Sequence, residues 1–532
     1  MTNRLGLLRT SFSSLAFLAF VFFLQPREAY ATDDSLVVRT TAGQIRGEAR
    51  AGGGAEFLGI PYAQPPVGDL RWREPQPAAT WSGIRDTSAF GAPCAQPVLG
   101  DWNHHDADNG KEDCLFLNIV TPAWPVKKPL PVMFWIHGGA NEGGSGTGDL
   151  YNSGTLVNHG VLLVTINYRL GIFGFFAHPA LTRESPHHAS GNYGLMDQIL
   201  ALRWVLDNIA NFGGDPHNIT VFGQSAGAMD TGMLMTSIVK DLFQKAIAES
   251  GSPVGPTIAP LADAEKSGDS LATDLKALAG DAAIAALRKL SAPDLLAALA
   301  ALPSTGRPRV GPDIDGWVLT RSPAAVFAAG QESKIPFLFG TTTREFGSSA
   351  TPDQLRGMIQ LVAGDFAPRA LAAYGLADGA SGTDDPKYGT PADQWTADII
   401  FRCPATAQAV WHTAAHHHTY EYEFDHPIPG QEEAVHSSEL PYVFGFFPKS
   451  GNIAGNFGTI DSKLADLIGT YFTNFAKTGD PNSAGRPPWP QFGDAQTFIQ
   501  FMPDGSVVPA ARLRAAQCSV FRDFLTDQIK QK

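Results

Sequence analysis

The sequence predicts an α/β protein built on a large, mostly parallel central β-sheet with helices on both of its faces. Two observations predict this class. Apolar runs typical of buried strands, such as Val132–Ile136 and Val161–Ile166, alternate with segments of helical periodicity between residues 130 and 250. A sharp turn at Gly223–Gly227 then joins a strand directly to a helix. Because parallel strands require crossover connections, this order favours a sheet that helices cover on both sides.

The elements can be assigned in chain order. Leu36–Arg39 and Gln44–Arg46 alternate as a strand pair, and Asn192–Asn208 carries leucine and isoleucine at helical spacing. Further strands are expected at Leu117–Val120, Ile219–Phe222, Ile335–Phe339 and Tyr420–Phe424. The composition shifts to Ala and Leu over residues 260–302, and residues 364–400 are helical and loop-like. We therefore expect a single domain over residues 32–532, with helical insertions near 255–305 and 350–400.

Composition narrows the classes of partner. The 532 residues are 44% hydrophobic and 17% charged, which is an ordinary globular composition. A formal net charge of −13 argues against nucleic acid or an anionic membrane surface as a main partner, because both carry negative charge. The sequence predicts no cofactor and does not specify an oligomeric state.

The N-terminus has the pattern of a targeting segment. Arg4 and Arg9 precede the apolar run Leu15–Leu24, which is followed by Ala29-Tyr30-Ala31. This pattern indicates a secretory signal peptide, residues 1–31, that is cleaved after Ala31. The run is shorter than the ~20 residues that span a bilayer, which disfavours an uncleaved anchor, and no later run reaches that length. We expect a secreted or periplasmic mature chain without a membrane span.

Four cysteines occur, at Cys94, Cys114, Cys403 and Cys518. An even number in an exported protein indicates two disulfides, for which three pairings exist. We favour the pairing of sequence neighbours, Cys94–Cys114 and Cys403–Cys518. Zinc ligation by cysteine is disfavoured because no C-x-x-C spacing is present.

The Gly223–Gly227 turn reads Gly-Gln-Ser-Ala-Gly, a G-x-S-x-G pattern between a strand and a helix. In this context the pattern predicts a nucleophile elbow, in which Ser225 projects from a turn too tight for neighbouring Cβ atoms. The first N–H groups of the following helix would favour negative charge that develops there. A serine hydroxyl also needs a general base and an orienting acid, and in this fold they follow in the order acid, then histidine.

His436 is the best placed base, because it lies in a loop after the strand Tyr420–Phe424. Glu345 follows the strand Ile335–Phe339 at the end of the sheet where such sites lie. Asp313 and Asp315 are alternative acids, although they flank a glycine turn.

The strand Val132–Ile136 ends in His137-Gly138-Gly139-Ala140, a glycine-rich turn whose backbone N–H groups could form an oxyanion hole. A dinucleotide loop is the alternative, but the glycines after residue 140 do not form G-x-G-x-x-G before a helix.

Two segments resemble metal sites. His412 and the run His416–His418 include an i, i+4 spacing, but no carboxylate is in register with them, so we expect a polar helix end. Asp106–Gly110 resembles the start of a calcium loop, but Glu112 comes too early to complete one. No metal site is predicted.

These residues belong to a longer series of motifs. The chain resembles the type-B carboxylesterase family, which includes cholinesterases and bacterial broad-range esterases. The resemblance covers nearly the whole mature chain. It rests, in order, on Phe57–Pro66, Glu112–Asn118, Asn167–Gly171, Asn192–Asp197, Phe212–Pro216, Gly223–Ala228, Glu345 and His436–Gly445.

The resemblance implies the α/β-hydrolase fold, with helical insertions over the active site, and hydrolysis of a small-molecule carboxylic ester through an acyl-enzyme. It implies Ser225 as nucleophile, His436 as base and then acid, and Glu345 as the acid that orients His436. The implied oxyanion hole is formed by the N–H groups of Gly139, Ala140 and Ala226, and Ser250 would support the acid. The family's disulfide pattern agrees with both favoured pairings.

Three positions depart from the family pattern. Gln224 stands where a glutamate often precedes the nucleophile, which disfavours quaternary-ammonium esters as substrates. Asn141 replaces an aromatic residue after the glycine-rich turn, and Phe346 stands where many relatives have glycine. A catalytically silent adhesion protein is the main alternative, and it is disfavoured because the three triad residues are present in order. Amidase or thioesterase activity on the same triad is a further alternative.

Overall fold

The computed structural model describes residues 36–531, except 153–154, 256–257, 278, 304–307 and 309. The predicted signal peptide, residues 1–31, lies outside the described residues.

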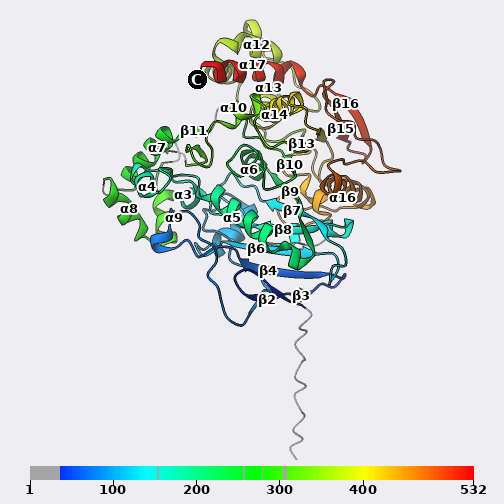
Figure 1. Cartoon of the computed structure of the whole chain (residues 1–532). Helices are drawn as coiled ribbons and strands as arrows, with labels where there is room; N and C mark the ends of the chain where they lie inside the picture. The colour runs from blue at the N-terminus through cyan, green and yellow to red at the C-terminus, as the bar shows by residue number, and fades with distance from the viewer. Residues whose placement is uncertain are drawn as a thin grey trace, which may run out of the picture. The chain divides into compact units, whose positions relative to one another are not determined.

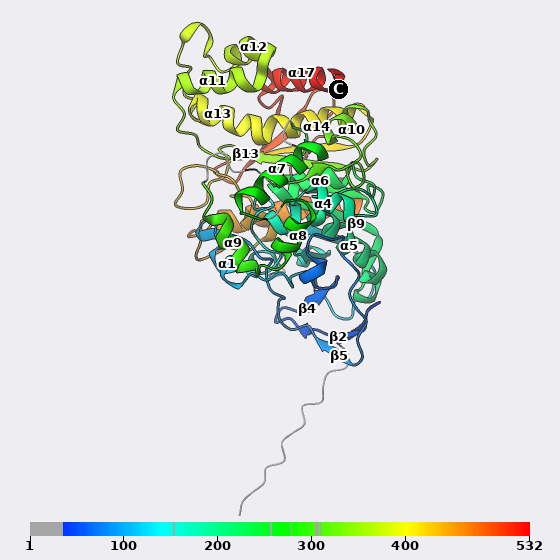
Figure 2. The same ribbon diagram turned by 90° about the vertical axis from the view of Figure 1, so that its left-hand side faces the viewer.

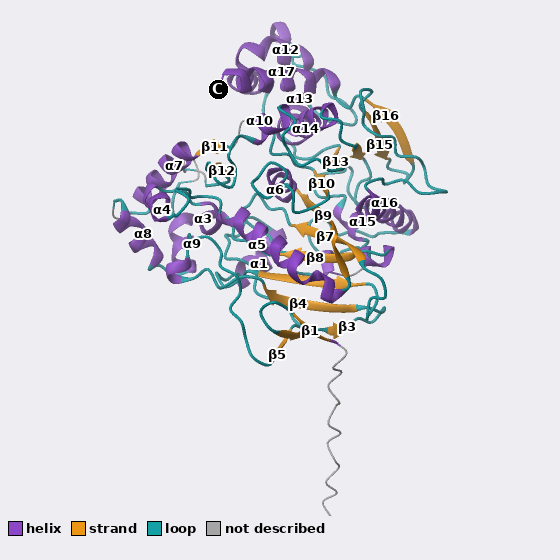
Figure 3. Cartoon of the chain, viewed as in Figure 1, coloured by secondary structure: helices purple, strands orange, loops and turns teal. Residues whose placement is uncertain are grey.

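An eleven-stranded β-sheet forms the centre of the fold (Figure 3). Its strand order is β16-β15-β14-β13-β10-β9-β7-β8-β6-β4-β3. The strands from β15 to β8 run parallel, and the strands at both edges pair antiparallel. The members of the sheet are β3 (Glu48–Ala49), β4 (Ala55–Pro61), β6 (Phe116–Thr121), β7 (Leu130–Ile136), β8 (Leu162–Ile166), β9 (Gly214–Gln224), β10 (Lys245–Glu249), β13 (Phe337–Thr342), β14 (Thr419–Phe424), β15 (Thr497–Phe501) and β16 (Val507–Ala511).

Two small sheets accompany the central one. The first contains β1 (Val37–Arg39), β2 (Gln44–Arg46) and β5 (Ile84–Asp86), and the second pairs β11 (Ala259–Pro260) with β12 (Asp313–Ile314). The expected strand pair near residue 40 is therefore present; its strands are antiparallel, and it belongs to a separate sheet. The expected central strands differ from the observed ones by a few residues at their ends.

Helices connect the parallel strands and surround the sheet (Figure 1). The longest helices are α5 (Tyr193–Asn208), α16 (Thr459–Thr478) and α17 (Ala515–Gln531), and none of the described helices is long and apolar enough to cross a bilayer. The others are α1 (His104–Asn109), α2 (Asp149–Asn152), α3 (Gly171–Phe175), α4 (Pro179–Glu184), α6 (Ala226–Leu234), α7 (Leu261–Asp274), α8 (Asp281–Arg288), α9 (Ala292–Ala300), α10 (Pro323–Ala328), α11 (Pro352–Ala363), α12 (Ala367–Ala373), α13 (Pro391–Ala397), α14 (Cys403–Ala414) and α15 (Leu440–Phe444).

Local sequence explains where several of these helices begin. Ser291, Ser322, Thr351 and Thr390 each accept a hydrogen bond from a backbone N–H in the first turn of α9, α10, α11 and α13. A proline follows the cap directly in α10, α11 and α13, and one residue later in α9. A hydroxyl at the N-cap satisfies an N–H that lacks an intrahelical acceptor, and proline fits the next position because its missing N–H is not needed.

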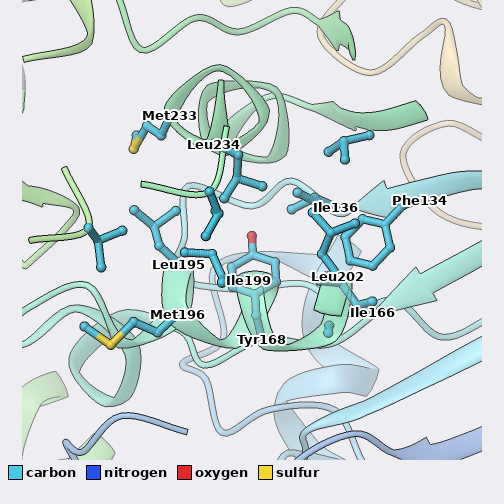
Figure 4. Close-up of a cluster of buried hydrophobic side chains, with 14 of the residues drawn as sticks. Phe134, Ile136, Ile166, Tyr168, Leu195, Met196, Ile199, Leu202, Met233 and Leu234 are labelled. Carbon is cyan, nitrogen blue, oxygen red and sulfur yellow. The ribbon is translucent and has the colours of Figure 1, made fainter. Parts of the chain in front are cut away.

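Each face of the sheet has its own core. Along β7, Phe134 and Ile136 pack into one cluster, whereas Met133 and Trp135 pack into the other, as the alternation of a strand requires. The first cluster includes α5 and α6, and Figure 4 shows leucines and isoleucines of α5 beside Ile136, Ile166 and Tyr168. The second cluster is covered by α15 and α16. Both faces of the parallel strands are thus buried.

A third core lies among the helices of the second insertion. Residues of α11, α12 and α13 pack together with Val520 of α17. Figure 2 shows these helices at the end of the molecule that also holds α14. The expected pairings Cys94–Cys114 and Cys403–Cys518 are both confirmed, and the second one joins α14 to α17.

Candidate active site

Ser225 stands on a strained turn between β9 and α6. Its backbone has φ 57° and ψ −122°, a conformation that a residue with a side chain adopts only when its surroundings enforce it. A Cβ on Gly227 would lie 2.0 Å from the carbonyl oxygen of Ile136, and one on Gly223 would lie 2.4 Å from the carbonyl oxygen of Gly227. The flanking glycines are therefore required by contact with β7 and with the turn itself. Ser225 remains partly exposed, while Gln224 and Ala226 are buried.

Backbone hydrogen bonds hold this turn at the carboxyl ends of the central strands. The N–H of Ser225 donates to the carbonyl oxygen of Glu249 at 2.8 Å, and the N–H of Ser250 donates to that of Gly340 at 2.8 Å. These two hydrogen bonds fix the position of the Ser225 turn relative to β10, and the position of the end of β10 relative to β13.

His436 and Glu345 come together from the loops that follow β14 and β13. Nδ1 of His436 lies 2.5 Å from Oε2 of Glu345, and the N–H of His436 donates to the carbonyl oxygen of Glu345 at 2.9 Å. The other carboxylate oxygen of Glu345 accepts the N–H of Thr342 at 2.9 Å. The Glu345 side chain is 0% exposed and that of His436 is 10% exposed, so water competes little for their contact. The expected histidine and acid are therefore hydrogen-bonded, and Asp313 and Asp315 contact neither of them.

The second ring nitrogen of His436 faces Gln224. Nε2 of the Gln224 amide lies 3.1 Å from Nε2 of His436 and 3.0 Å from Oγ of Ser437. Both contacts of the imidazole are satisfied when Nδ1 carries the proton and donates it to Glu345, while Nε2 accepts from the amide. Among the described residues, Oγ of Ser225 makes no hydrogen bond. In this structure the hydrogen bond to Nε2 of His436 therefore comes from Gln224 and not from Ser225.

The glycine-rich turn after β7 lies directly against Ser225. A Cβ on Gly138 would be 3.1 Å from Cβ of Ser225. Gly139 and Ala140 have positive φ values of 112° and 59°. Within the described part of the chain, the N–H groups of Gly139, Ala140 and Ala226 donate to no acceptor. Unused donors beside a serine can bind an oxygen on which negative charge develops.

Asn141 connects this turn to α6 by a hydrogen bond. Its Nδ2 donates to Asp230 at 3.0 Å, and its Oδ1 accepts the hydroxyl of Tyr168 at 3.0 Å. Gln198 donates to the other oxygen of Asp230 at 2.6 Å. Burial raises the pKa of Asp230 to about 7, against the two amide hydrogen bonds that lower it. Asn141, a departure from the family pattern, therefore has a structural explanation.

Comparison with known proteins agrees with this architecture. The family model described as "Carboxylesterase family" matches residues 34–521. This chain belongs to the carboxylesterase family. It is 36% identical to fumonisin B1 esterase of Sphingopyxis macrogoltabida, over 93% of this chain and 92% of the relative. It is 36% identical to para-nitrobenzyl esterase of Bacillus subtilis (84% and 91%) and 32% identical to liver carboxylesterase of Sus scrofa (93% and 94%). The chain is accordingly a carboxylic ester hydrolase with the α/β-hydrolase fold.

Two further carboxyl groups of this carboxylesterase are buried near the His436–Glu345 pair. Burial, assisted by the charge of Glu439, raises the pKa of Glu249 well above its ordinary value. Burial and the charge of Glu345 raise the pKa of Glu439 to about 8. Neither carboxyl group has a hydrogen-bond partner among the described residues. Burial therefore disfavours the charged form of both carboxyl groups.

Ser250 is the serine that the resemblance implies as a support for the acid. Its side chain is buried and its φ is 50°, but its Oγ has no hydrogen-bond partner among the described residues. Its contribution in this structure is the backbone hydrogen bond to β13.

Two aromatic rings flank His436. The ring centroids of Phe346 and Phe401 lie 4.5 Å and 4.8 Å from that of His436, and 5.3 Å from each other. Phe346 is 47% exposed, so it presents an apolar surface beside His436. Phe401 belongs to a π-helical turn, Asp398–Arg402, between α13 and α14. Such turns are frequent at functional sites.

Arg402 supports the acid loop from the same π-helical turn. Its guanidinium donates to the carbonyl oxygens of Thr342 and Thr343 at 3.1 Å and 3.2 Å, and it pairs with Asp398. The sequence reading missed Phe401 and Arg402 because they lie far from the triad motifs, in a segment of weak periodicity. Glu439 was missed as an individual residue, although it lies three positions after His436 within a family motif.

Proposed function

We propose that the chain hydrolyses carboxylic esters through an acyl-enzyme on a triad of Ser225, His436 and Glu345. The observation that carries the proposal is the buried His436–Glu345 hydrogen bond beside a serine on a strained strand-to-helix turn. A histidine whose Nδ1–H is held by a carboxylate keeps Nε2 free to accept a proton, which is what a serine hydroxyl needs in order to attack.

The proposed reaction begins when substrate displaces the Gln224 amide from Nε2 of His436. Ser225 then attacks the ester carbonyl while its proton moves to Nε2. The N–H groups of Gly139, Ala140 and Ala226 stabilise the oxyanion, and the imidazolium returns the proton to the departing alcohol. Water next attacks the acyl-enzyme by the same route in reverse, and the acid is released. Loss of one oxyanion donor typically lowers kcat about 100–1000-fold.

The decisive experiment combines activity with covalent labelling. Ser225→Ala should reduce p-nitrophenyl acetate turnover to background, and a fluorophosphonate probe should label the wild-type chain at Ser225. The exposed Ser349, replaced by alanine, is a matched control that should keep both signals. Full turnover in Ser225→Ala would refute the nucleophile, and absence of labelling and turnover in the wild type would favour a silent interaction protein.

We further propose that the preferred esters are uncharged near the reacting carbonyl. Gln224 places a neutral amide 3.1 Å from His436, where a carboxylate would attract a cation, and Phe346 adds an apolar surface. Acetylcholine and its neutral carbon isostere, dimethylbutyl acetate, form a matched substrate pair. The neutral ester should have the higher kcat/KM, and a clear preference for the cationic ester would contradict this assignment.

We also propose that residues 1–31 are a signal peptide, and that residues 32–532 form one secreted or periplasmic catalytic domain with the two helical insertions. The two disulfides support an oxidising destination. Mass spectrometry of the chain after export from a host that processes leaders should find Thr32 as the first residue. Retention of Met1 on exported protein would refute the cleavage site.

A further inference from the structure

A cluster of metal-binding side chains lies at the end of β13 remote from Glu345. Glu332 comes from the loop before β13, His412 from the last turn of α14, and His417 from the connection between α14 and β14. One ligand atom from each residue lies within 4.8 Å of the others. The expectation of a polar helix end rested on the lack of a carboxylate in register with the histidines. Glu332, which is 80 residues away in sequence, supplies that carboxylate.

The orientation of His412 is fixed by its two ring nitrogens. Nε2 lies 2.8 Å from the carbonyl oxygen of Ile335, which can only accept, so Nε2 carries a proton. Nδ1 faces Oε1 of Glu332 at 2.8 Å. Histidines that bind metals commonly donate one ring N–H to a backbone carbonyl, which leaves the other nitrogen for the metal. In His412 that other nitrogen is Nδ1, which lies beside the Glu332 carboxylate.

Glu332 brings an unsatisfied oxygen to this cluster. Glu332 is 1% exposed, and its Oε2 has no hydrogen-bond partner among the described residues. A buried, unpartnered carboxylate oxygen is costly unless a cation or a donor reaches it. His412 is also fully buried, whereas His417 is partly exposed and opens the cluster to solvent.

From this geometry we propose that Glu332, His412 and His417 form a zinc(II) site. Two imidazoles and one carboxylate are ligands that zinc accepts, at bond lengths of about 2.0–2.2 Å, and water completes the tetrahedron. Tetrahedral ligands at such distances lie about 3.3 Å apart. The ligand atoms lie within 4.8 Å of one another, and Nδ1 of His412 and Oε1 of Glu332 are 2.8 Å apart, so the side chains must adjust to reach that value. Binding releases the proton shared by Nδ1 of His412 and Glu332 to solvent.

The position assigns the ion a structural role. It lies at the carboxyl end of α14, where the helix dipole favours a cation. It joins the α14–β14 connection to the loop before β13, whereas Glu345 and His436 follow the carboxyl ends of β13 and β14. Zinc would therefore stabilise the fold without entering the ester hydrolysis proposed above.

The test uses the full mature chain without an affinity tag, stripped with EDTA and then dialysed against zinc chloride. Bound zinc is measured by mass spectrometry of the metal, and affinity by competition with a chromophoric chelator. We expect one zinc per chain in the wild type and in the control His418→Gln, which alters an exposed neighbour in the same run. His417→Gln should lower the affinity by at least about tenfold, and Glu332→Gln should do the same.

Thermal unfolding provides an independent readout. Zinc chloride should raise the unfolding temperature of the wild type and of His418→Gln but not that of His417→Gln, because a ligand stabilises only the state that binds it. Magnesium chloride should have no such effect, since magnesium prefers oxygen ligands. His417 is partly exposed and lies outside the buried His412–Glu332 pair, so its replacement should leave the fold intact. Equal zinc binding by wild type and His417→Gln, or no stoichiometric zinc in the wild type, would overturn the proposal.

Discussion

Glu345→Gln removes one charge from the candidate active site while keeping the shape of the side chain. In the wild type, one oxygen of Glu345 accepts Nδ1–H of His436 at 2.5 Å and the other accepts the N–H of Thr342 at 2.9 Å. A glutamine that keeps its oxygen on Thr342 must turn its NH₂ group toward His436. Nδ1 then becomes an acceptor, the ring proton moves to Nε2, and the histidine presents a donor to Ser225 where a base is required.

The expected loss is large because the pair is buried. The Glu345 side chain is 0% exposed and that of His436 is 10% exposed, so solvent does not restore the lost interaction. The wrong tautomer of a triad histidine lowers kcat by about 10⁴-fold in the serine-protease case. That factor corresponds to about 5 kcal/mol of barrier. We expect a decrease in kcat of this order.

Steady-state hydrolysis of p-nitrophenyl acetate measures the effect, with thermal unfolding as the check on folding. Glu249→Gln is a matched carboxyl-to-amide control in the same buried region. Because burial disfavours the charged form of Glu249, its neutral amide variant should retain wild-type kcat. A folded Glu345→Gln protein with kcat within tenfold of wild type would refute the assigned role of Glu345.

Three other predictions concern stability, the elbow and selectivity. The raised pKa of Glu439, about 8, means that the folded chain keeps a proton that the unfolded chain releases near its ordinary pKa of 4.5, so this group costs stability increasingly as the pH rises between those values. Glu439→Gln should therefore raise the unfolding temperature relative to wild type at about pH 9 but not at about pH 4.5, and an identical pH dependence of the two proteins would contradict this. Gly227→Ala places a Cβ 2.0 Å from the carbonyl oxygen of Ile136 and should cost about 1–3 kcal/mol of unfolding free energy together with fluorophosphonate labelling; wild-type labelling would exclude the steric argument. Phe346→Ala should lower kcat/KM for aryl esters roughly tenfold more than for methyl esters, by loss of apolar contact beside His436, and a uniform decrease across the ester series would count against it.

Features set by local chain geometry were predictable from sequence. Ser225 was identifiable because the elbow needs glycines at fixed positions, and Cβ atoms there would strike neighbouring backbone. His436 and Glu345 were identifiable because parallel strands bring the loops at their carboxyl ends together. An even cysteine count after a predicted signal peptide indicated two disulfides, and the favoured pairing of sequence neighbours is the one observed. The contact of Gln224 with His436, by contrast, depends on side-chain orientation that no periodicity records.

Features that depend on distant packing were not predictable. Phe401 and Arg402 reach the site through a π-helical turn, whose extra residue changes the direction of every later side chain in the helix. Glu332 and His412 meet across 80 residues of sequence. For Ser250 the motif gave the position in the chain but not the side-chain contact, because its hydroxyl forms no hydrogen bond to the acid.

The separate core of α11–α13 affects how this enzyme could diversify. The residues of the candidate active site are aligned by backbone hydrogen bonds across β9, β10 and β13, whereas the second insertion packs mainly on itself and on α17. Segments of related enzymes could be grafted in place of α11 and α12, whereas α13 should be kept because its Asp393 accepts the N–H of Ser348 in the loop that carries Glu345. Chimeras of this kind would change the residues that surround the ester and would keep the arrangement of Ser225, His436 and Glu345.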